Sequence, residues 1–195
     1  MKNIYIVSIA FIVLIYSCNQ PNYKKDAITY NNKGSQFFLK NERDSALHYF
    51  TLATESDPKY QTAIQNKANT LIALEQYDKS VSVIEDLIKL NPYPEAFTVK
   101  GILLDKMNKP NDAQLVYEEG LKLFEERLLK ISEDRKSEVM LGIGQLYYLK
   151  EDTTKAKSIL NEHKIKGKDL GLADTMLNNL DNKMKFIDYV LKKMG

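Results

Sequence analysis

Small and large apolar residues recur along this chain with a period close to 34 residues. Small residues, which we call the anchors, stand at Gly34, Ala68, Gly101 and Gly144, at intervals of 34, 33 and 43 positions. Large apolar residues occur four positions before, three after and sixteen after each anchor. They are Tyr30, Phe37 and Phe50; Ile64, Leu71 and Ile84; Phe97, Leu104 and Tyr117; and Met140, Tyr147 and Leu160. Because offsets of three, four and seven bring side chains to one helical face, each copy predicts helices and not strands.

Each copy predicts a helical hairpin. A second small residue follows each anchor after twelve positions, so two antiparallel helices can approach closely beside the large side chains. These second small residues are Ala46, Ser80, Ala113 and Ala156. A single hairpin of this kind cannot bury its own apolar face, so we expect neighbouring hairpins to stack into an all-α solenoid.

Turn-forming residues separate the predicted helices. Asp57–Pro58 and Asn91–Pro92 each combine an N-cap residue with a proline. This combination predicts that the proline occupies the first position of the next helix. Pro110 and the segment Asp152–Thr154 predict two further helix starts.

Two segments depart from the regular period. The interval between Gly101 and Gly144 holds about nine extra residues, and apolar residues continue through it at helical spacing. This pattern predicts one long helix, Pro110 to Ile131, which would overhang its neighbours by about 13 Å. We expect a final helix over Asp169–Lys193 to cap the exposed face of the last repeat.

The period, with Ala53 and Pro58 at their expected places, resembles the tetratricopeptide repeat (TPR) family. The copies span residues 27–60, 61–93, 94–131 and 137–168, and the capping helix spans 169–195. The resemblance implies a right-handed superhelical TPR-like α-solenoid, whose concave groove holds a protein or peptide partner. Gly120 and Glu125 depart from the family pattern in the third copy, and the fourth copy lacks the closing proline.

The resemblance also assigns the residues that would line the groove, on the first helix of each hairpin. They are Asn31, Ser35, Phe38, Gln65, Asn66, Asn69, Ile72, Thr98, Ile102, Asp105, Leu141, Gln145 and Tyr148. Amides are frequent among them toward the N-terminus, and amides can pair with a peptide backbone without requiring a charge. The co-chaperone branch of the family binds a carboxylate with a clamp of which only Asn66 is matched, so we do not expect a partner of that class.

A lysine precedes each of the first three anchors, at Lys33, Lys67 and Lys100. Two interpretations of this row stay open. The aliphatic stems could cover apolar surface while the ammonium groups reach water. Alternatively, the three lysines could form a basic stripe for an anionic partner.

The N-terminal segment resembles a bacterial lipoprotein signal peptide. Lys2 precedes an apolar run over residues 4–16, which is shorter than the roughly 20 residues of a membrane span. Ser17–Cys18 resembles the lipobox, in which the cysteine is diacylated and becomes the mature N-terminus. An uncleaved signal anchor or a plain secretory peptide is the alternative interpretation.

The lipobox resemblance implies a location. It divides the segment into a signal peptide over 1–17 and a lipidated tether over 18–26, with Cys18 as the lipidation site. Asn19 stands where some lipoproteins carry an aspartate that retains them in the inner membrane. We therefore expect a lipid-anchored protein of the bacterial cell envelope, at the outer membrane.

Composition excludes several kinds of chemistry. The 195-residue chain has 28 basic and 26 acidic side chains, and a net charge of +2 is too small for a nucleic-acid-binding protein. The single cysteine excludes an intrachain disulfide, and His48 and His163 are the two histidines. No nucleotide-binding, zinc-protease or serine-hydrolase motif occurs. We therefore expect no catalysis, no metal, no cofactor and no small-molecule substrate.

These features predict a non-catalytic, membrane-anchored adaptor or scaffold that binds a protein or peptide partner. The family includes outer-membrane lipoproteins that assist β-barrel insertion or pilus and secretin assembly, which implies a more specific role as an accessory of an assembly or secretion machine. Two other hypotheses stay open. A carbohydrate-capturing lipoprotein would group Phe38, Tyr147 and Tyr148 on an exposed face, and a structural component would self-assemble through the long helix or the final helix.

Overall fold

The structure is a computed structural model that describes residues 23–164, 170–179 and 182–194, and within these residues the regular secondary structure is helical throughout. The predicted signal peptide and the predicted lipidation site, Cys18, lie outside the described residues. Contacts divide the helices into two compact units. The N-terminal unit takes in the first four helices up to Pro92 together with the end of the chain from Leu191, and the C-terminal unit runs from Tyr93 to Val190.

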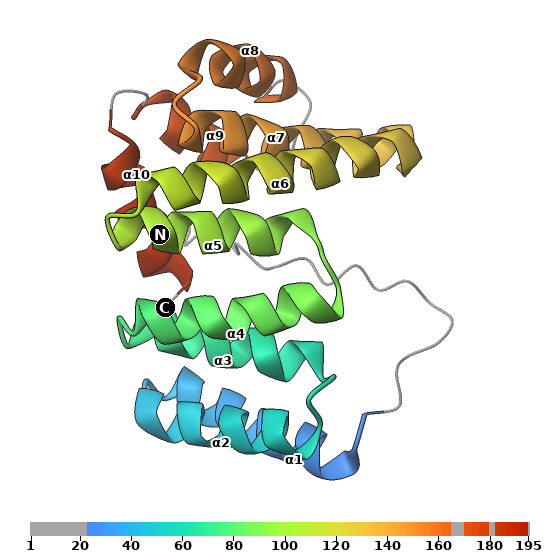
Figure 1. Ribbon diagram of the computed structural model, residues 1–195, viewed down its shortest axis with the longest axis vertical. Coiled ribbons are helices and arrows are strands. Elements are labelled where there is room, and N and C mark those ends of the chain that lie inside the picture. Colours follow the sequence, from blue (N-terminus) through green and yellow to red (C-terminus); the bar gives the residue numbers. More distant parts are fainter. Residues whose placement is uncertain (1–22, 165–169, 180–181, 195) are drawn as a thin grey trace, which may run out of the picture. The chain divides into compact units, whose positions relative to one another are not determined.

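The N-terminal unit is built from two helical hairpins. α1 (Lys25–Leu39) pairs with α2 (Arg43–Ser56), and α3 (Gln61–Ala73) pairs with α4 (Tyr77–Leu90). α3 also packs on α1 and α2, as Figure 1 shows. A buried cluster of Tyr60 with three alanines fills the junction of α1, α2 and α3. α1 begins at Lys25, so the helix takes in the end of the segment predicted as a tether.

The C-terminal unit continues the pattern. α5 (Pro94–Lys106) and α6 (Pro110–Lys130) form one hairpin, and α7 (Lys136–Leu149) and α8 (Thr153–Lys164) form the next. The 3₁₀ helix η1 (Glu133–Arg135) joins α6 to α7, and α7 packs on both α5 and α6. Two further helices follow, α9 (Leu170–Leu177) and α10 (Lys183–Met194). The predicted all-α, TPR-like solenoid class is confirmed.

The glycine anchors pack as their spacing predicts. Gly34 lies against the ring of Phe50, and Gly101 lies against the ring of Tyr117, each sixteen positions later in the chain. A Cβ added at these two glycines would come within 2.7 Å and 2.2 Å of ring carbons, well inside van der Waals contact. Gly144 lies against Leu160 in the same way. At each glycine anchor, a large side chain of the hairpin's second helix therefore packs directly on the backbone of the first helix.

The same turn joins the two helices of every hairpin. Seven positions after each anchor stands a residue with positive φ, namely Asn41 (63°), Glu75 (57°), Asn108 (58°) and Glu151 (65°). In each turn the N–H of this residue donates to the carbonyl three positions back, and the next N–H donates to the carbonyl five positions back. This is the Schellman motif, in which a left-handed residue ends a helix. The repeat therefore extends to backbone conformation as well as packing.

The prediction for two of the prolines was wrong. α3 begins at Gln61 and α5 at Pro94, so Pro58 and Pro92 lie in the preceding turns and not at the first helical position. Asp57 shows the reason, because its carboxylate accepts the backbone N–H groups of Lys24 (3.0 Å) and Lys59 (3.1 Å) and so organises a turn. Hydrogen bonding to the Lys24 N–H, more than any other influence, lowers the pKa of Asp57.

The other predicted helix starts are confirmed. Pro110 opens α6, and α8 begins at Thr153. Ahead of α8, the Asp152 carboxylate accepts the backbone N–H of Lys155 (3.1 Å), which is the N-cap arrangement.

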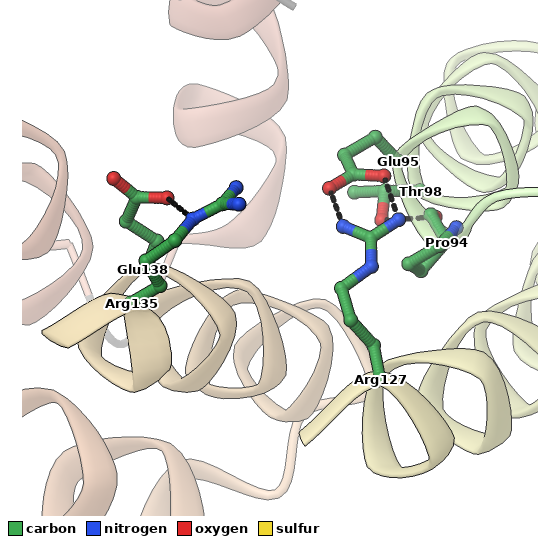
Figure 2. A network of polar contacts seen from close by, with 6 residues as sticks. All are labelled: Pro94, Glu95, Thr98, Arg127, Arg135 and Glu138. Carbon is green, nitrogen blue, oxygen red and sulfur yellow. Dashed lines mark hydrogen bonds and ion pairs between the residues drawn. The ribbon is translucent and has the colours of Figure 1, made fainter. Parts of the chain in front are cut away.

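The long helix of the third copy is confirmed, because α6 runs from Pro110 to Lys130. Its last turns do not project freely. The guanidinium of Arg127 donates two hydrogen bonds, of 2.5 and 3.1 Å, to the carboxylate of Glu95 in the first turn of α5 (Figure 2). A two-pronged pair of this kind fixes geometry better than a single-contact ion pair does. It holds the overhanging end of α6 to the start of α5.

The C-terminal segment differs from its prediction, because one helix was expected over Asp169–Lys193 and the described residues form two. Asparagines explain the interruption. The side chain of Asn179 donates to the carbonyl of Thr175 (2.6 Å) just after α9, and the Asn182 carboxamide oxygen accepts the N–H of Lys185 (2.9 Å) at the start of α10. Such side-chain bonds to the backbone compete with a continuous helix. α9 packs on α7 and α8, so α10 is left to pack elsewhere.

Candidate functional site

The residues predicted to line a groove, which we call the inner positions, fall into two sets, one in each unit. Those of α1 and α3 belong to the N-terminal unit, and those of α5 and α7 belong to the C-terminal unit. The two sets differ in what surrounds them.

In the N-terminal unit, a chain of polar contacts joins α1 to α3. The buried Asn31 donates to the hydroxyl of Tyr60 (3.4 Å) and accepts a hydrogen bond from the side chain of Asn66 (2.9 Å). Ser35 and Thr70 donate to carbonyls of their own helices. Because a buried amide is stable only when it is paired, Asn31 and Asn66 fix how the two hairpins meet. These two amides therefore have a structural role.

The remaining inner positions of this unit are half-buried, with the exception of Ile72. Gln65 and Asn69 are half-buried on α3, and Ile72 is buried at its end. The ring of Phe38 lies 3.8 Å below the guanidinium of Arg43, which also donates to the Phe38 carbonyl (2.8 Å). The side chains of Gln65, Asn69 and Phe38 are therefore only partly covered within the unit.

In the C-terminal unit, four of the six inner positions are buried. Thr98, Ile102, Asp105 and Tyr148 are buried, while Leu141 and Gln145 are half-buried. The hydroxyl of Thr98 donates to the Pro94 carbonyl within α5. Asp105 and Tyr148 contact residues of α10 and of the turn before it, which the spacing along the chain did not place at these positions.

A buried ion pair joins α10 to α5. The ammonium of Lys183 lies 2.9 Å from the carboxylate of Asp105, and the two side chains are 12% and 3% exposed. The hydroxyl of Tyr117 donates to the same carboxylate oxygen (2.7 Å), and the ammonium stands 5.9 Å from the centre of the Tyr117 ring. Burial, and next to it the charge of Asp105, raises the pKa of Tyr117 far above its ordinary value. Tyr117 therefore stays protonated and remains a donor to Asp105.

Aromatic and polar contacts extend this interface. Tyr148 packs edge-to-face on Phe186 of α10 with ring centres 5.0 Å apart, and its hydroxyl donates to the carbonyl of Asn179 (2.6 Å). On α5, Lys106 pairs with Asp188 of α10 at 2.7 Å. Tyr148 is thus covered within its own unit, so the exposed group of Phe38, Tyr147 and Tyr148 expected for carbohydrate capture does not form around it.

One sequence signal could have shown this arrangement. The position four residues after each anchor holds Phe38, Ile72 and Tyr148 in three copies and Asp105 in the other. A carboxylate at a position that is otherwise large and apolar requires a cation when it is buried. Nothing local to Asp105 identified Lys183 as that cation.

The three lysines before the anchors have different surroundings. The ammonium of Lys33 lies 4.4 Å above the centre of the Tyr49 ring, an arrangement in which the aromatic face attracts the cation. Lys67 and Lys100 are half-buried. Both interpretations of this row of lysines stay open.

The described residues offer no metal-binding group of three or more His, Cys, Asp or Glu side chains. His48 is exposed beside the ring of Tyr49, and the side chain of His163 lies outside the described part of the molecule. Among the helices of the described residues, none is both long and apolar enough to cross a membrane.

Comparisons with known proteins agree with the geometry. Residues 62–94 match the tetratricopeptide repeat family. A tetratricopeptide repeat protein from Parabacteroides merdae aligns with 86% of this chain and 62% of its own, at 17% identity and a TM-score of 0.60. PilF of Pseudomonas aeruginosa aligns over 86% of this chain and 73% of its own, at 18% identity and a TM-score of 0.58.

A third structure has the same fold. YrrB, described as a TPR protein with an unusual peptide-binding site, aligns over 87% of this chain and 84% of its own, at 18% identity and a TM-score of 0.52. With the repeated hairpins, anchors and turns, these matches show that the described residues have the fold of tetratricopeptide repeat proteins and that residues 62–94 contain a recognised repeat of that family.

Proposed function

We propose that this protein is a non-catalytic adaptor that binds a peptide or protein partner on the inner positions of α1 and α3. The observation that carries the proposal is the state of those positions. Asn31 and Asn66 hold the two hairpins in a fixed relation, while Gln65 and Asn69 beside them are half-buried with amides that a peptide backbone can use. A rigid scaffold with accessible amides suits recognition of an extended chain. YrrB, which shares the fold, is described as having a peptide-binding site.

We propose further that the adaptor acts in the bacterial cell envelope, anchored by lipid on Cys18. The support is the apolar segment that ends in Ser17–Cys18. Two or three acyl chains, at about 0.8 kcal/mol for each buried CH₂, would hold the protein on a membrane permanently. An accessory role in an outer-membrane assembly or secretion machine is the more specific version of this proposal.

A peptide-display selection tests the binding face. Peptides selected on the wild-type chain would be titrated against the variant Gln65→Ala/Asn69→Ala and against Ser82→Ala, which changes an exposed residue of α4. Loss of amide hydrogen bonds in a partly desolvated interface should weaken binding by about tenfold or more, whereas Ser82→Ala should leave it unchanged. Equal binding by the double variant and the wild type would place the site elsewhere.

A further inference from the structure

α10 occupies the inner positions of the C-terminal unit as a ligand would. Its side chains Phe186, Ile187 and Val190 are buried, while Met184, Lys185 and Asp188 are exposed. The helix therefore lies with one apolar face inward and one polar face outward.

The buried carboxylate of Asp105 requires a positively charged partner from any helix that packs on this face. A buried charge without a partner is strongly destabilising, and the Tyr117 hydroxyl supplies one hydrogen bond but no positive charge. The cation comes from Lys183. Any helix that replaced α10 would have to bring a cation to the same point.

Two charge pairs also fix the direction of the helix. Asp105 and Lys106 are adjacent on α5, and they pair with Lys183 and Asp188, which are five positions apart on α10. Between them Phe186 meets the ring of Tyr148. A helix laid in the reverse direction would bring like charges together, so the pairs select orientation as well as composition.

We propose that the inner face of α5 and α7 is a docking site for an amphipathic helix, with lysine at one position, an aromatic residue three positions later and an acidic residue five positions later. In the chain itself α10 fills the site until such a helix from a partner displaces it. The existence of a partner that supplies the helix rests on the proposed adaptor function. The recognition of such a helix by α5 and α7 does not depend on that function.

The test uses the chain's own helix as the probe. A fluorescein-labelled peptide of residues 182–194 would be titrated by fluorescence anisotropy against the full chain and against a chain that ends at residue 181. The short peptide must fold on binding, so its affinity will be modest. The truncated chain should bind it about 100-fold more tightly than the full chain, because a tethered helix competes at high effective concentration.

Peptide variants test the recognition chemistry. The peptide with Lys183→Gln should bind the truncated chain about 30-fold more weakly, because it leaves Asp105 buried without its cation. The control peptide with Lys185→Gln, which changes an exposed lysine two positions away, should bind like the unaltered peptide. Asp105→Asn in the truncated chain should remove the difference in affinity between the unaltered peptide and the Lys183→Gln peptide. Binding that is absent, or that does not depend on the lysine, overturns the proposal.

Hydrogen exchange covers the case in which the truncated chain does not fold. In the full chain, Lys183→Gln should increase exchange in α10 while α5–α8 stay protected. Loss of protection throughout α5–α8 would make α10 an integral part of the unit and overturn the proposal. A dimer whose α10 protection disappears on dilution would show that a second copy supplies the helix, which also overturns it. None of these measurements involves the inner positions of α1 and α3. Their failure would therefore not count against the adaptor proposal, and failure of the adaptor proposal would not count against them.

Discussion

A missing side chain positions the two helices of a hairpin. At Gly101 the absent Cβ makes room for the ring of Tyr117, and that ring in turn carries the hydroxyl that binds Asp105. The same residue therefore serves helix packing and, through Tyr117, the contact with α10. Gly34 with Phe50 and Gly144 with Leu160 repeat the packing without the polar extension.

Gly101→Ala should destabilise the protein by about 1–3 kcal/mol, because the buried Tyr117 ring cannot move away without breaking its hydrogen bond to Asp105. Urea denaturation followed by circular dichroism measures the loss. Gly120→Ala is the matched control, since its Cβ would come no closer than 3.1 Å to Leu146, and its effect should be smaller. A larger loss for Gly120→Ala would contradict the packing argument.

At the scale of the element, the turn within each hairpin imposes one backbone conformation on four different sequences. The left-handed residue is asparagine in two turns and glutamate in the other two. Asparagine tolerates this conformation and glutamate does so less readily. The hairpins therefore hold Glu75 and Glu151 in a strained conformation, which the surrounding hydrogen bonds and packing maintain.

Glu75→Val should destabilise the N-terminal unit by about 1 kcal/mol or more, because a β-branched residue is strongly disfavoured at positive φ. Glu75→Asn should be neutral or slightly stabilising. Urea midpoints of the two variants give the comparison. Ser82→Val, at an exposed helical position of α4, controls for the general effect of valine and should change stability by about 0.5 kcal/mol or less.

Across the whole molecule, the same repeated hairpin presents different inner positions in the two units. The inner positions of α1 and α3 include the half-buried Gln65 and Asn69, while Asp105 of α5 and Tyr148 of α7 are buried in contact with α10. In the adaptor we propose, a helix that binds the C-terminal unit would first have to replace α10.

The proposed anchor is tested on the full-length chain expressed in a bacterium. The wild-type chain should incorporate labelled palmitate and lose residues 1–17, whereas Cys18→Ser should remain unlabelled and uncleaved. Mass spectrometry of the membrane fraction measures both results. Cleavage of the Cys18→Ser variant at the same bond would instead indicate an ordinary secretory peptide.

Spacing along the chain was sufficient to predict the helices, the hairpins, the anchors and the length of α6. These features depend on residues close together in the chain, where helical geometry converts spacing into contact. Where local chemistry competed, the prediction failed. The Asp57 carboxylate formed a turn ahead of α3, and the asparagines divided the C-terminal helix.

Which inner positions stay accessible depends on packing between residues far apart in the chain. Asn31 and Asn66 are predicted groove amides that pair with each other, and Asp105 and Tyr148 are predicted groove residues that α10 and the turn before it cover. Lys106 and Asp188 meet across 82 positions of sequence. No period relates α10 to α5, and the partner of a buried charge is set by packing in three dimensions. The sequence could therefore show that Asp105 needs a cation, but not which lysine supplies it.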